Sequence, residues 1–442
     1  MNIYQNPARE EWLQLLQRPS FDTAELHKNV KHILKDVKKD GDKAIKKYTK
    51  KFDDIKLKDF EVTSKEIEEA IASLPENLKN AIQIAADNIR KFHSKQFTAP
   101  EIIETMQGIQ CWRKCVAIEK VGLYIPGGTA PLFSTILMLG IPAKIAGCKE
   151  IILCTPPDKN KKLHPAILFA AKLVGVTRIF RIGGVQAIAA MAYGTETVPQ
   201  VYKIFGPGNQ YVTHAKQMIQ QDGVAIDMPA GPSEVCVIAD ETSNPAYVAA
   251  DLLSQAEHGP DSQVLLISTS LDLVEDVMEE IQKQLKELDR KKIAIKALEN
   301  SKAIVVNDLN EAIIIANEYA PEHLILCCEN EELIAEQINN AGSIFLGHYS
   351  PESVGDYASG TNHTLPTNGF AKLYSGVSVD SFVKKITYQK LTQQGLYNIS
   401  DTVIQMAEAE GLDAHANAVR VRMSAPLSGT IFSNDAELGL ER

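Results

Sequence analysis

Between residues 112 and 346, short apolar segments alternate with segments of helical periodicity, and this alternation constrains the fold more than any other feature of the sequence. The expected strands of a first run are 116–119, 121–125, 151–154, 178–182, 202–205 and 224–227, and those of a second run are 235–238, 264–267, 303–306, 324–326 and 343–346. Short apolar strands that alternate with helices are typical of parallel sheets covered on both faces. The sequence therefore predicts two successive α/β sheets, and their similar pattern suggests a duplicated unit.

The segments outside this alternation predict mainly helices. Residues 1–20 have the pattern of a short helical arm, and residues 21–95 that of amphipathic helices with a basic, solvated face. Residues 348–369 are rich in Gly, Ser, Thr and Pro, and a loop of this length is usually functional or disordered. The tail after about residue 380 has helical periodicity with a break at Gly411.

Composition argues against several classes of function. The 442 residues carry a formal net charge of −10, which makes nucleic acid an unsuitable partner. No apolar run reaches the length of a membrane span, and the first residues lack the basic and apolar regions of a secretory signal. The seven cysteines lack the spacing of a zinc knuckle, and most of them lie in apolar runs that predict core packing. A reduced, cytoplasmic compartment is the simplest expectation.

Glycine-containing turns follow three of the expected strands in the first sheet. They are Pro126-Gly127-Gly128-Thr129, Gly183-Gly184 and Gly206-Pro207-Gly208-Asn209. Glycines at the carboxyl ends of parallel strands let backbone N–H groups approach a phosphate, which favours a nucleotide or phosphate cleft. The sequence contains no G-x-G-x-x-G motif and no acidic residue clearly placed to take a ribose, so a purely steric role for these glycines stays open.

The stretch 244–261 predicts a complete helix whose last turn carries two candidate metal ligands. Asn244 suits the N-cap and Pro245 the first helical position, and a Gly-Pro pair ends the helix. Gln255 and His258 lie three apart on one face, at the end of the helix where partial negative charge favours a cation. An amide oxygen and an imidazole form half of a zinc site, and a solvated surface turn is the alternative.

Further candidates lie in other turns and loops. Glu322 and His323 are adjacent between a helix and an apolar strand, where they could supply a base and an acid in different environments. The remaining candidates are Ser233, Asp356, His363, Glu410 and His415. Gln255, His258, Asp356 and His415 together would offer four nitrogen or oxygen ligands, a set that zinc accepts. Each of these residues alone is more often a surface residue than part of a site, and sequence spacing does not show that they meet.

Seven motifs, in order, resemble the histidinol dehydrogenase family. They are VGLYIPGGTAP, FGPGNQYVTHAK, AIDMPAGPSEV, LLSQAEHGPDSQ, APEHL, GDYASGTNHTLPT and AEGLDAHANAV. The resemblance covers nearly the whole chain and is weakest in the lysine-rich N-terminal part. It implies an NAD-dependent, zinc-containing enzyme of the last steps of histidine biosynthesis. Such an enzyme would oxidise L-histidinol to L-histidinaldehyde and then to L-histidine, with two NAD.

The resemblance also implies roles for individual residues and for a second subunit. The zinc ligands would be Gln255, His258, Asp356 and His415, and the catalytic acid–base pair would be Glu322 and His323. Ser233, His363 and Glu410 would join these residues in the substrate pocket, and Tyr124, Gln186 and Asn209 would contact NAD. The family is homodimeric with one zinc ion per subunit, so Glu410 and His415 would be supplied to the neighbouring subunit's site.

On this basis the sequence predicts two Rossmann-like parallel-sheet domains that lack the glycine fingerprint. A helical arm at 1–20 would precede a larger domain built from 21–120 and 235–378, which would hold the zinc and catalytic residues. Residues 121–234 would form the second domain, on the NAD side, and residues 379–442 a helical segment exchanged in the dimer.

The residue types fit an alcohol oxidation. A primary alcohol loses hydride only as its hydroxyl proton leaves, so a neutral base is needed near His323, and Glu322 would activate the water that hydrates the aldehyde. The metal would mainly orient the substrate. Three alternatives stay open: a related dehydrogenase acting on another small polar alcohol, a zinc hydrolase, and a non-catalytic nucleotide-binding protein.

Overall fold

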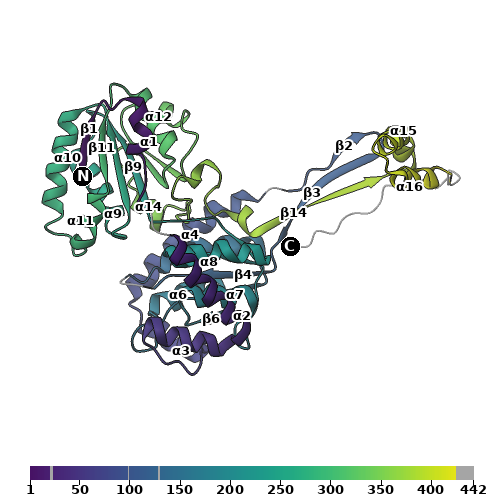
Figure 1. Cartoon of the computed structure of the whole chain (residues 1–442), viewed down its shortest axis with the longest axis horizontal. Coiled ribbons are helices and arrows are strands. Elements are labelled where there is room, and N and C mark those ends of the chain that lie inside the picture. The colour runs from purple at the N-terminus through teal and green to yellow at the C-terminus, as the bar shows by residue number, and fades with distance from the viewer. Residues whose placement is uncertain (20–22, 98, 128–129, 425–442) are drawn as a thin grey trace. The chain divides into compact units, whose positions relative to one another are not determined.

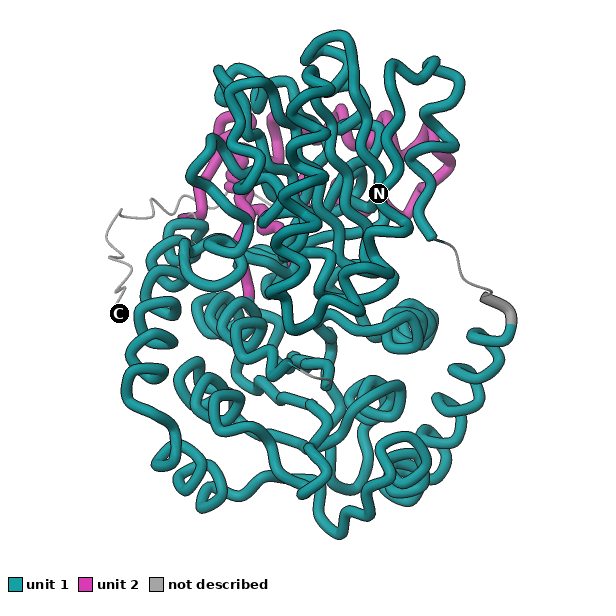
Figure 2. Tube along the Cα trace, turned by 90° about the vertical axis from the view of Figure 1, so that its left-hand side faces the viewer, with its two compact units in different colours: residues 1–97, 117–383 teal, residues 98–116, 384–442 magenta. Residues whose placement is uncertain are grey.

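The computed structural model describes residues 1–19, 23–97, 99–127 and 130–424. The chain divides into two compact units, of which residues 1–97 with 117–383 form the first and residues 98–116 with 384–442 the second (Figure 2). The first unit contains two parallel sheets. The second is built on a small antiparallel sheet and two helices.

The two parallel sheets form the framework of the first unit (Figure 1). The five-stranded sheet has the order β6-β5-β4-β7-β8, with β4 (Lys120–Tyr124), β5 (Glu150–Cys154), β6 (Arg178–Phe180), β7 (Lys203–Phe205) and β8 (Ala225–Ile226). The six-stranded sheet has the order β1-β11-β10-β9-β12-β13, with β1 (Asn2–Gln5), β9 (Glu234–Ala239), β10 (Gln263–Ser268), β11 (Lys302–Val305), β12 (His323–Cys327) and β13 (Ser343–Leu346). Both expected α/β sheets are confirmed, but the strand expected at 116–119 is not part of the first, because residues 116 and 117 end strand β3 (Ile109–Ala117) of the three-stranded sheet. Without β1, both follow the same order of third, second, first, fourth and fifth strand.

Helices cover both faces of each sheet, as buried parallel strands require. One face of the five-stranded sheet packs on α3 (Ser64–Ser73), α4 (Glu76–His93), α5 (Phe133–Ala146) and α6 (Pro165–Val174), and the other on α2 (Thr23–Asp53), α7 (Gly184–Tyr193) and α8 (Gln210–Ile219). One face of the six-stranded sheet packs on α9 (Pro245–Ala256), α10 (Leu271–Gln284) and α11 (Lys291–Glu299), and the other on α1 (Arg9–Leu15), α12 (Leu309–Tyr319) and α13 (Glu331–Ala335). Strands β9, β10 and β12 are buried along their whole length, which explains their continuous apolar sequences.

The helices α2 to α4 pack on the five-stranded sheet, whereas we expected residues 21–120 to join residues 235–378 in one domain. The apolar stripe of α2, which includes Val30 and Val37, is buried in the same core as α7 and α8. Such a stripe shows which face of a helix is buried but not which sheet buries it. The helices cover the sheet that follows them directly in sequence.

The first residues form a strand, and the helix that we expected over 1–20 is confined to α1 (Arg9–Leu15). Strand β1 pairs in parallel with β11 at the edge of the six-stranded sheet, with Asn2 opposite Lys302. Helix α1 follows, and Trp12 packs into the core of the same sheet. The prediction missed β1 because a mostly exposed edge strand of four residues has no apolar alternation.

The polar loop after the six-stranded sheet contains a short helix, α14 (Glu352–Tyr357). We expected residues 348–369 to be irregular throughout. Helix α14 packs against α9, and this contact brings the loop to the candidate metal ligands at the end of α9.

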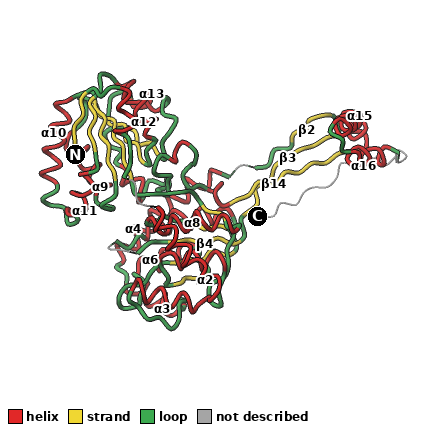
Figure 3. The backbone as a smooth tube through the Cα atoms, in the orientation of Figure 1, coloured by secondary structure: helices red, strands yellow, loops and turns green. Residues whose placement is uncertain are grey.

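The second unit is built on a three-stranded sheet in the order β14-β3-β2. Its elements are β2 (Ile103–Met106), β3 (Ile109–Ala117), β14 (Val383–Leu391), α15 (Gln393–Ala409) and α16 (Asp413–Met423) (Figure 3). Trp112 of β3 stacks on Tyr388 of β14 with ring centroids 5.3 Å apart. The segment 379–442, which we expected to be helical, thus includes a strand, which the sequence did not reveal because its side chains are nearly all exposed. The expected break at Gly411 is confirmed, with a φ of +72°. Residues 425–442 of this segment lie outside the described part of the chain.

The cysteines in apolar runs pack in the core, as predicted. All seven cysteines are free, and the five in apolar runs are buried: Cys148, Cys154, Cys236, Cys327 and Cys328. None of the described helices combines the length and the apolar character that crossing a lipid bilayer requires.

Candidate active site

Most of the candidate residues line one cavity of about 1150 Å³ in the first unit. One wall comes from the carboxyl ends of the five-stranded sheet, where Gly208 and Asn209 line the cavity. The other wall comes from the amino end of the six-stranded sheet, with Glu322 and His323 at the start of β12. The five-stranded sheet therefore presents the edge that binds ligands in open α/β folds, and the six-stranded sheet presents its opposite edge.

Helix α9 positions two of the expected metal ligands. The side chain of Asn244 accepts a hydrogen bond of 2.9 Å from the backbone N–H of Ala246, so the expected N-cap is confirmed. Gln255 is buried in the last turn of the helix, and His258 lies just beyond the helix end, where it lines the cavity and reaches water. Asp356, which α14 supplies, lines the same cavity.

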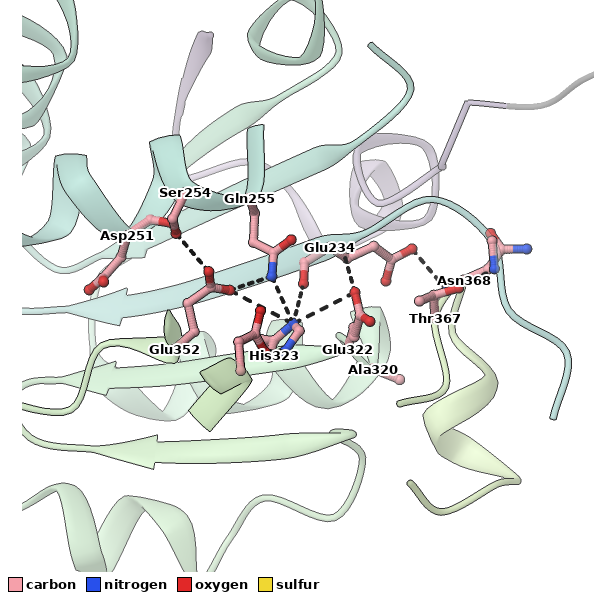
Figure 4. A network of polar contacts seen from close by, with 12 residues as sticks. Glu234, Asp251, Ser254, Gln255, Ala320, Glu322, His323, Glu352, Thr367 and Asn368 are labelled. Carbon is pink, nitrogen blue, oxygen red and sulfur yellow. Dashed lines mark hydrogen bonds and ion pairs between the residues drawn. The ribbon is translucent and has the colours of Figure 1, made fainter. Parts of the chain in front are cut away.

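The side-chain amide of Gln255 is oriented as a metal ligand. Its Nε2 donates to the carboxylate of the buried Glu352, and its Oε1 is buried with no hydrogen-bond partner among the described residues (Figure 4). A buried oxygen without a partner is unfavourable, and a cation would satisfy it. No group of three or more His, Cys, Asp or Glu side chains suited to a metal ion occurs in the described ranges. Gln255, His258 and Asp356 line the same cavity, and an amide oxygen, an imidazole and a carboxylate are donor types that zinc accepts.

The surroundings of His258 and Asp356 favour the forms that bind a metal. Desolvation by the surrounding chain lowers the pKa of His258 and favours the neutral imidazole, although the side chain still reaches water and the charge of Asp356 opposes the shift. Burial disfavours ionisation of Asp356, but the hydrogen bond and charge of His323 hold the pKa of that carboxyl below its usual value. A neutral imidazole and an ionised carboxylate are the states that coordinate zinc.

Glu322 and His323 are buried side by side (Figure 4). His323 Nδ1 lies 3.6 Å from Glu322 Oε2 and 3.2 Å from the backbone oxygen of Glu234, and His323 Nε2 lies 3.3 Å from Asp356 Oδ1. Burial disfavours the imidazolium, but the charge of Glu322 and the hydrogen bond to Asp356 outweigh it and raise the pKa of His323. Burial raises the pKa of Glu322, against the attraction of His323. The two groups can therefore exchange roles as base and acid.

A charged pair behind Glu322 fixes its position. Glu322 Oε2 accepts a hydrogen bond of 2.9 Å from the backbone N–H of Glu234. Arg18 holds the buried carboxylate of Glu234 through Nε–Oε1 and Nη2–Oε2 distances of 2.5 and 2.9 Å, and its guanidinium lies 4.0 Å from the centre of the Tyr319 ring. A bidentate pair with a stacked guanidinium has a defined geometry, so the strand that carries Glu234 is held in place beside the acid–base pair.

The long polar loop brings His363 to the cavity. His363 Nδ1 lies 2.8 Å from the backbone oxygen of Asp356, and Nε2 lies 3.0 Å from Thr135 Oγ1. Burial lowers the pKa of His363. The structure thus brings together in one cavity the seven catalytic, metal-binding and substrate-binding candidates of the first unit: Ser233, Gln255, His258, Glu322, His323, Asp356 and His363.

A second cavity, of about 950 Å³, lies over the carboxyl ends of the five-stranded sheet. The three expected NAD contacts line it: Tyr124, Gln186 and Asn209. Asn209 also lines the first cavity, as does Pro126, so the two spaces meet at these residues. Gln186 Oε1 is buried, and no described residue donates a hydrogen bond to it, so a ligand's donor fits there.

The glycine turns border these cavities. Besides Pro126 and Asn209, the lining residues from the turns are Gly127, Gly184, Pro207 and Gly208, whereas Gly128 and Thr129 lie outside the described residues. Gly206 has a φ of +120°, and a Cβ there would lie 2.0 Å from the backbone oxygen of Tyr124, so only glycine fits. The buried ion pair of Lys216 and Asp227 holds both backbone groups of Gly206, each at 2.8 Å.

Glu410 and His415 belong to the second unit. Glu410 directly follows α15 and His415 lies in the first turn of α16, on either side of the bend at Gly411. Both side chains are exposed within that unit. Their membership of the site stays a prediction.

Several residues of the site have no signal in the sequence. Arg18 and Glu234 are 216 positions apart, and no local pattern connects them. Glu352 and Asp356 are four apart, which places both on one face of a helical turn, and this spacing is the signal that could have revealed Glu352.

Comparisons with known proteins agree with the motifs. The family model for histidinol dehydrogenase matches residues 16–423. A histidinol dehydrogenase of Bacteroides thetaiotaomicron is 60% identical over 424 residues, which is 96% of this chain and 99% of the relative. One from Vibrio vulnificus (strain YJ016) is 50% identical over 95% of this chain and 97% of the relative. The crystal structure of histidinol dehydrogenase from Elizabethkingia anophelis is similar with a TM-score of 0.93 and 56% identity, over 96% of this chain and 98% of that chain.

Proposed function

The chain belongs to the histidinol dehydrogenase family, and we propose that it oxidises L-histidinol to L-histidine by way of L-histidinaldehyde, in two successive hydride transfers to NAD. One observation carries this proposal. The pair of Glu322 and His323 shares a cavity with Gln255, His258 and Asp356, and that cavity meets a second one over the carboxyl ends of a parallel sheet. Acid–base groups, zinc donors and a dinucleotide crevice are the parts that two such oxidations need.

Gln255, His258 and Asp356 would hold one zinc ion per subunit, with His415 as the fourth ligand. The unpartnered Oε1 of Gln255 supports this assignment. When bound, zinc would orient the substrate through its imidazole and amino nitrogens.

His323 is the base of the first oxidation in this proposal. In the neutral form that this step requires, the proton of His323 would lie on Nδ1, 3.2 Å from the backbone oxygen of Glu234, and Nε2 would accept the hydroxyl proton. Asp356 Oδ1, 3.3 Å from Nε2, stabilises the imidazolium that then forms. Removal of the hydroxyl proton allows the hydride to leave for the nicotinamide.

Glu322 is the base of the second oxidation. The aldehyde must add water before it can lose a second hydride, and a buried carboxylate beside the cavity can take a proton from that water. Burial raises the pKa of Glu322, which brings this base closer to neutral pH and strengthens it. The backbone N–H of Glu234 holds Oε2 at 2.9 Å and so fixes its direction.

The proposal includes a homodimer in the cytoplasm. The bend at Gly411 leaves Glu410 and His415 exposed within their own unit, so a neighbouring subunit has access to them. Free thiols at all seven cysteines suit a reducing compartment.

The test is the amount of NADH formed from a limiting, known amount of L-histidinol, repeated after chelation and after zinc is restored. We expect two NADH per histidinol, a loss with the chelator and a recovery with zinc. One NADH would contradict the double oxidation. The absence of NADH from a folded, zinc-loaded sample would contradict the assignment of L-histidinol as the substrate.

Glu322→Gln should slow aldehyde oxidation by about 10²–10⁴-fold and alcohol oxidation much less, because a neutral amide does not accept the proton of water. The two half-reactions are measured separately, with L-histidinol and with L-histidinaldehyde, in single turnovers. Glu332→Gln, at an exposed position of α13, is the matched control. Equal losses in both half-reactions would contradict this division of roles.

A further inference from the structure

Asp53 is an acidic residue of the second cavity to which sequence reasoning gave no role. It is the last residue of α2, and its carboxylate lines the cavity together with Tyr124. Its Oδ2 is buried, and no described residue donates a hydrogen bond to it. Burial raises the pKa of Asp53, which is the mark of a carboxylate that lacks donors. A buried acceptor of this kind inside a cavity fits a ligand that brings hydroxyl groups.

The strand order shows which part of a dinucleotide this end of the cavity would take. In doubly wound sheets the turn after the first strand takes the pyrophosphate, and an acidic residue at the end of the second strand holds the adenosine ribose. Here the first strand is β4 and the second is β5. The turn after β5 begins Thr155-Pro156-Pro157, without an acid.

Asp158, the next residue of that turn, is already occupied by its own loop. Its Oδ1 accepts the backbone N–H groups of Asn160 and Lys162 at 2.9 and 2.8 Å, and its side chain is exposed. Asp53 lies in the same cavity from outside the sheet and has its buried oxygen free.

We propose that Asp53 accepts a hydrogen bond from the 2′-hydroxyl of the adenosine ribose and thereby selects NAD over NADP. The inference rests on the proposed use of NAD. A carboxylate at contact distance stabilises the hydroxyl and repels a 2′-phosphate. Lys51, Lys159 and Lys162 also line the cavity, but all three are exposed, so solvent screens their attraction for a phosphate.

The experiment compares binding of NAD, NADP and the 2′-deoxyadenosine analogue of NAD by calorimetry, with the zinc-loaded enzyme. The wild type should bind the 2′-deoxy analogue about tenfold more weakly than NAD, the size of a hydrogen bond to a charged group, and NADP more weakly still. Asp53→Asn keeps a neutral oxygen acceptor but loses the charge, so it should bind NAD more weakly, should distinguish NAD from the 2′-deoxy analogue less than the wild type does, and should lose most of its discrimination against NADP.

Asp54→Asn is the matched control. Asp54 is the next residue, is exposed and pairs with Lys50, and its φ of +57° is one that asparagine adopts readily. This variant removes the same charge one position away and should keep the wild-type affinities.

Two outcomes overturn the inference without touching the proposed function. One is a wild type that binds NAD and its 2′-deoxy analogue equally well, a result that needs no variant to fold. The other is an Asp53→Asn variant that keeps the wild-type preference for NAD over NADP. A wild type that neither binds NAD nor reduces it with L-histidinol would instead overturn the proposed function.

Discussion

At the scale of single residues, the site depends on side chains that orient others. Gln255 presents Oε1 without a hydrogen-bond partner because its Nε2 donates to Glu352. Ser254 in turn donates to Glu352 at 2.7 Å. Outer groups of this kind fix the direction of a metal ligand, and their loss weakens metal binding.

Glu352→Ala should therefore weaken zinc binding by about 10–100-fold, because the amide of Gln255 can then rotate. Glu352→Gln keeps an oxygen acceptor at this position and should restore part of the affinity. Zinc affinity is measured by competition with a chromogenic chelator, independently of turnover. Unchanged affinity in a folded Glu352→Ala protein would contradict this role.

Asp251 makes a second residue-scale prediction, on pH and stability. Burial, and then the charge of Glu352, raise the pKa of Asp251 to about 7 from an ordinary value of 3.8. The folded state thus holds a proton that the unfolded state has released, so this carboxyl destabilises the fold increasingly as the pH rises from about 4 to about 7.

Asp251→Asn removes that titration. The free energy of unfolding of the variant, relative to the wild type, should rise between about pH 4 and pH 7 and then level off, with a total change on the order of 4 kcal/mol. Urea unfolding across this range, with both proteins treated with chelator, measures the change. A difference that does not vary with pH would contradict the raised pKa.

Sequence reasoning could reveal a residue of the site only where that residue and its partner are close together in the chain. Gln255 and His258 share one helix end, and Glu322 and His323 are adjacent, so local spacing was enough. Glu234 acts on Glu322 through tertiary contact, and such a contact leaves no periodic trace in the sequence.

At the scale of elements, periodicity predicted the buried strands and helices well and the exposed ones poorly. Strands β9, β10 and β12 were found because every position is buried and their central residues are apolar. Strands β1 and β14 are mostly exposed and were read as helix. The helices α2 to α4 were found, but an amphipathic stripe does not name the sheet that covers it, so their assignment to the six-stranded sheet was wrong.

The turn between β7 and α8 makes an element-scale prediction. Gly206→Ala should lower the free energy of unfolding by about 2–4 kcal/mol, because a Cβ would meet the backbone oxygen of Tyr124 and force β4 and β7 apart. Gly223→Ala is the control, since Gly223 has a similar positive φ of +89° with nothing within 4 Å, and should cost about 1 kcal/mol. Equal losses in urea unfolding would show that backbone conformation, not the close approach, requires Gly206.

At the scale of the whole molecule, the two parallel sheets of the first unit share one strand order but face the candidate site with different edges. The five-stranded sheet presents its carboxyl edge and the six-stranded sheet its amino edge. The sequence predicted both sheets, but it gave no indication that the amino end of the six-stranded sheet, not its carboxyl end, carries Glu322 and His323. That arrangement follows from how the two layers pack, and packing between distant segments has no local pattern.

The proposed dimer can be tested by mixing inactive subunits. His323→Asn and His415→Asn should each inactivate the enzyme, and co-expressed together they should recover about a quarter of the wild-type activity. Half of the dimers would be hybrids, each with one intact site, if His415 is supplied by the neighbouring subunit. A mixture that stays inactive, although hybrid dimers are isolated with two different tags, would contradict exchange.

At the carboxyl end of the six-stranded sheet, side chains that follow β9 close the space between the strands. Asp240, directly after β9, accepts the backbone N–H of Glu329 at 2.8 Å, and Ser243 donates to the backbone oxygen of Cys327 at the end of β12. These bonds tie together the two strands between which the matching crevice of the five-stranded sheet opens. In the six-stranded sheet, these bonds close the crevice that corresponds to the open one of the five-stranded sheet. Although the chain has two sheets of the same strand order, we therefore expect it to bind dinucleotide with a stoichiometry of one.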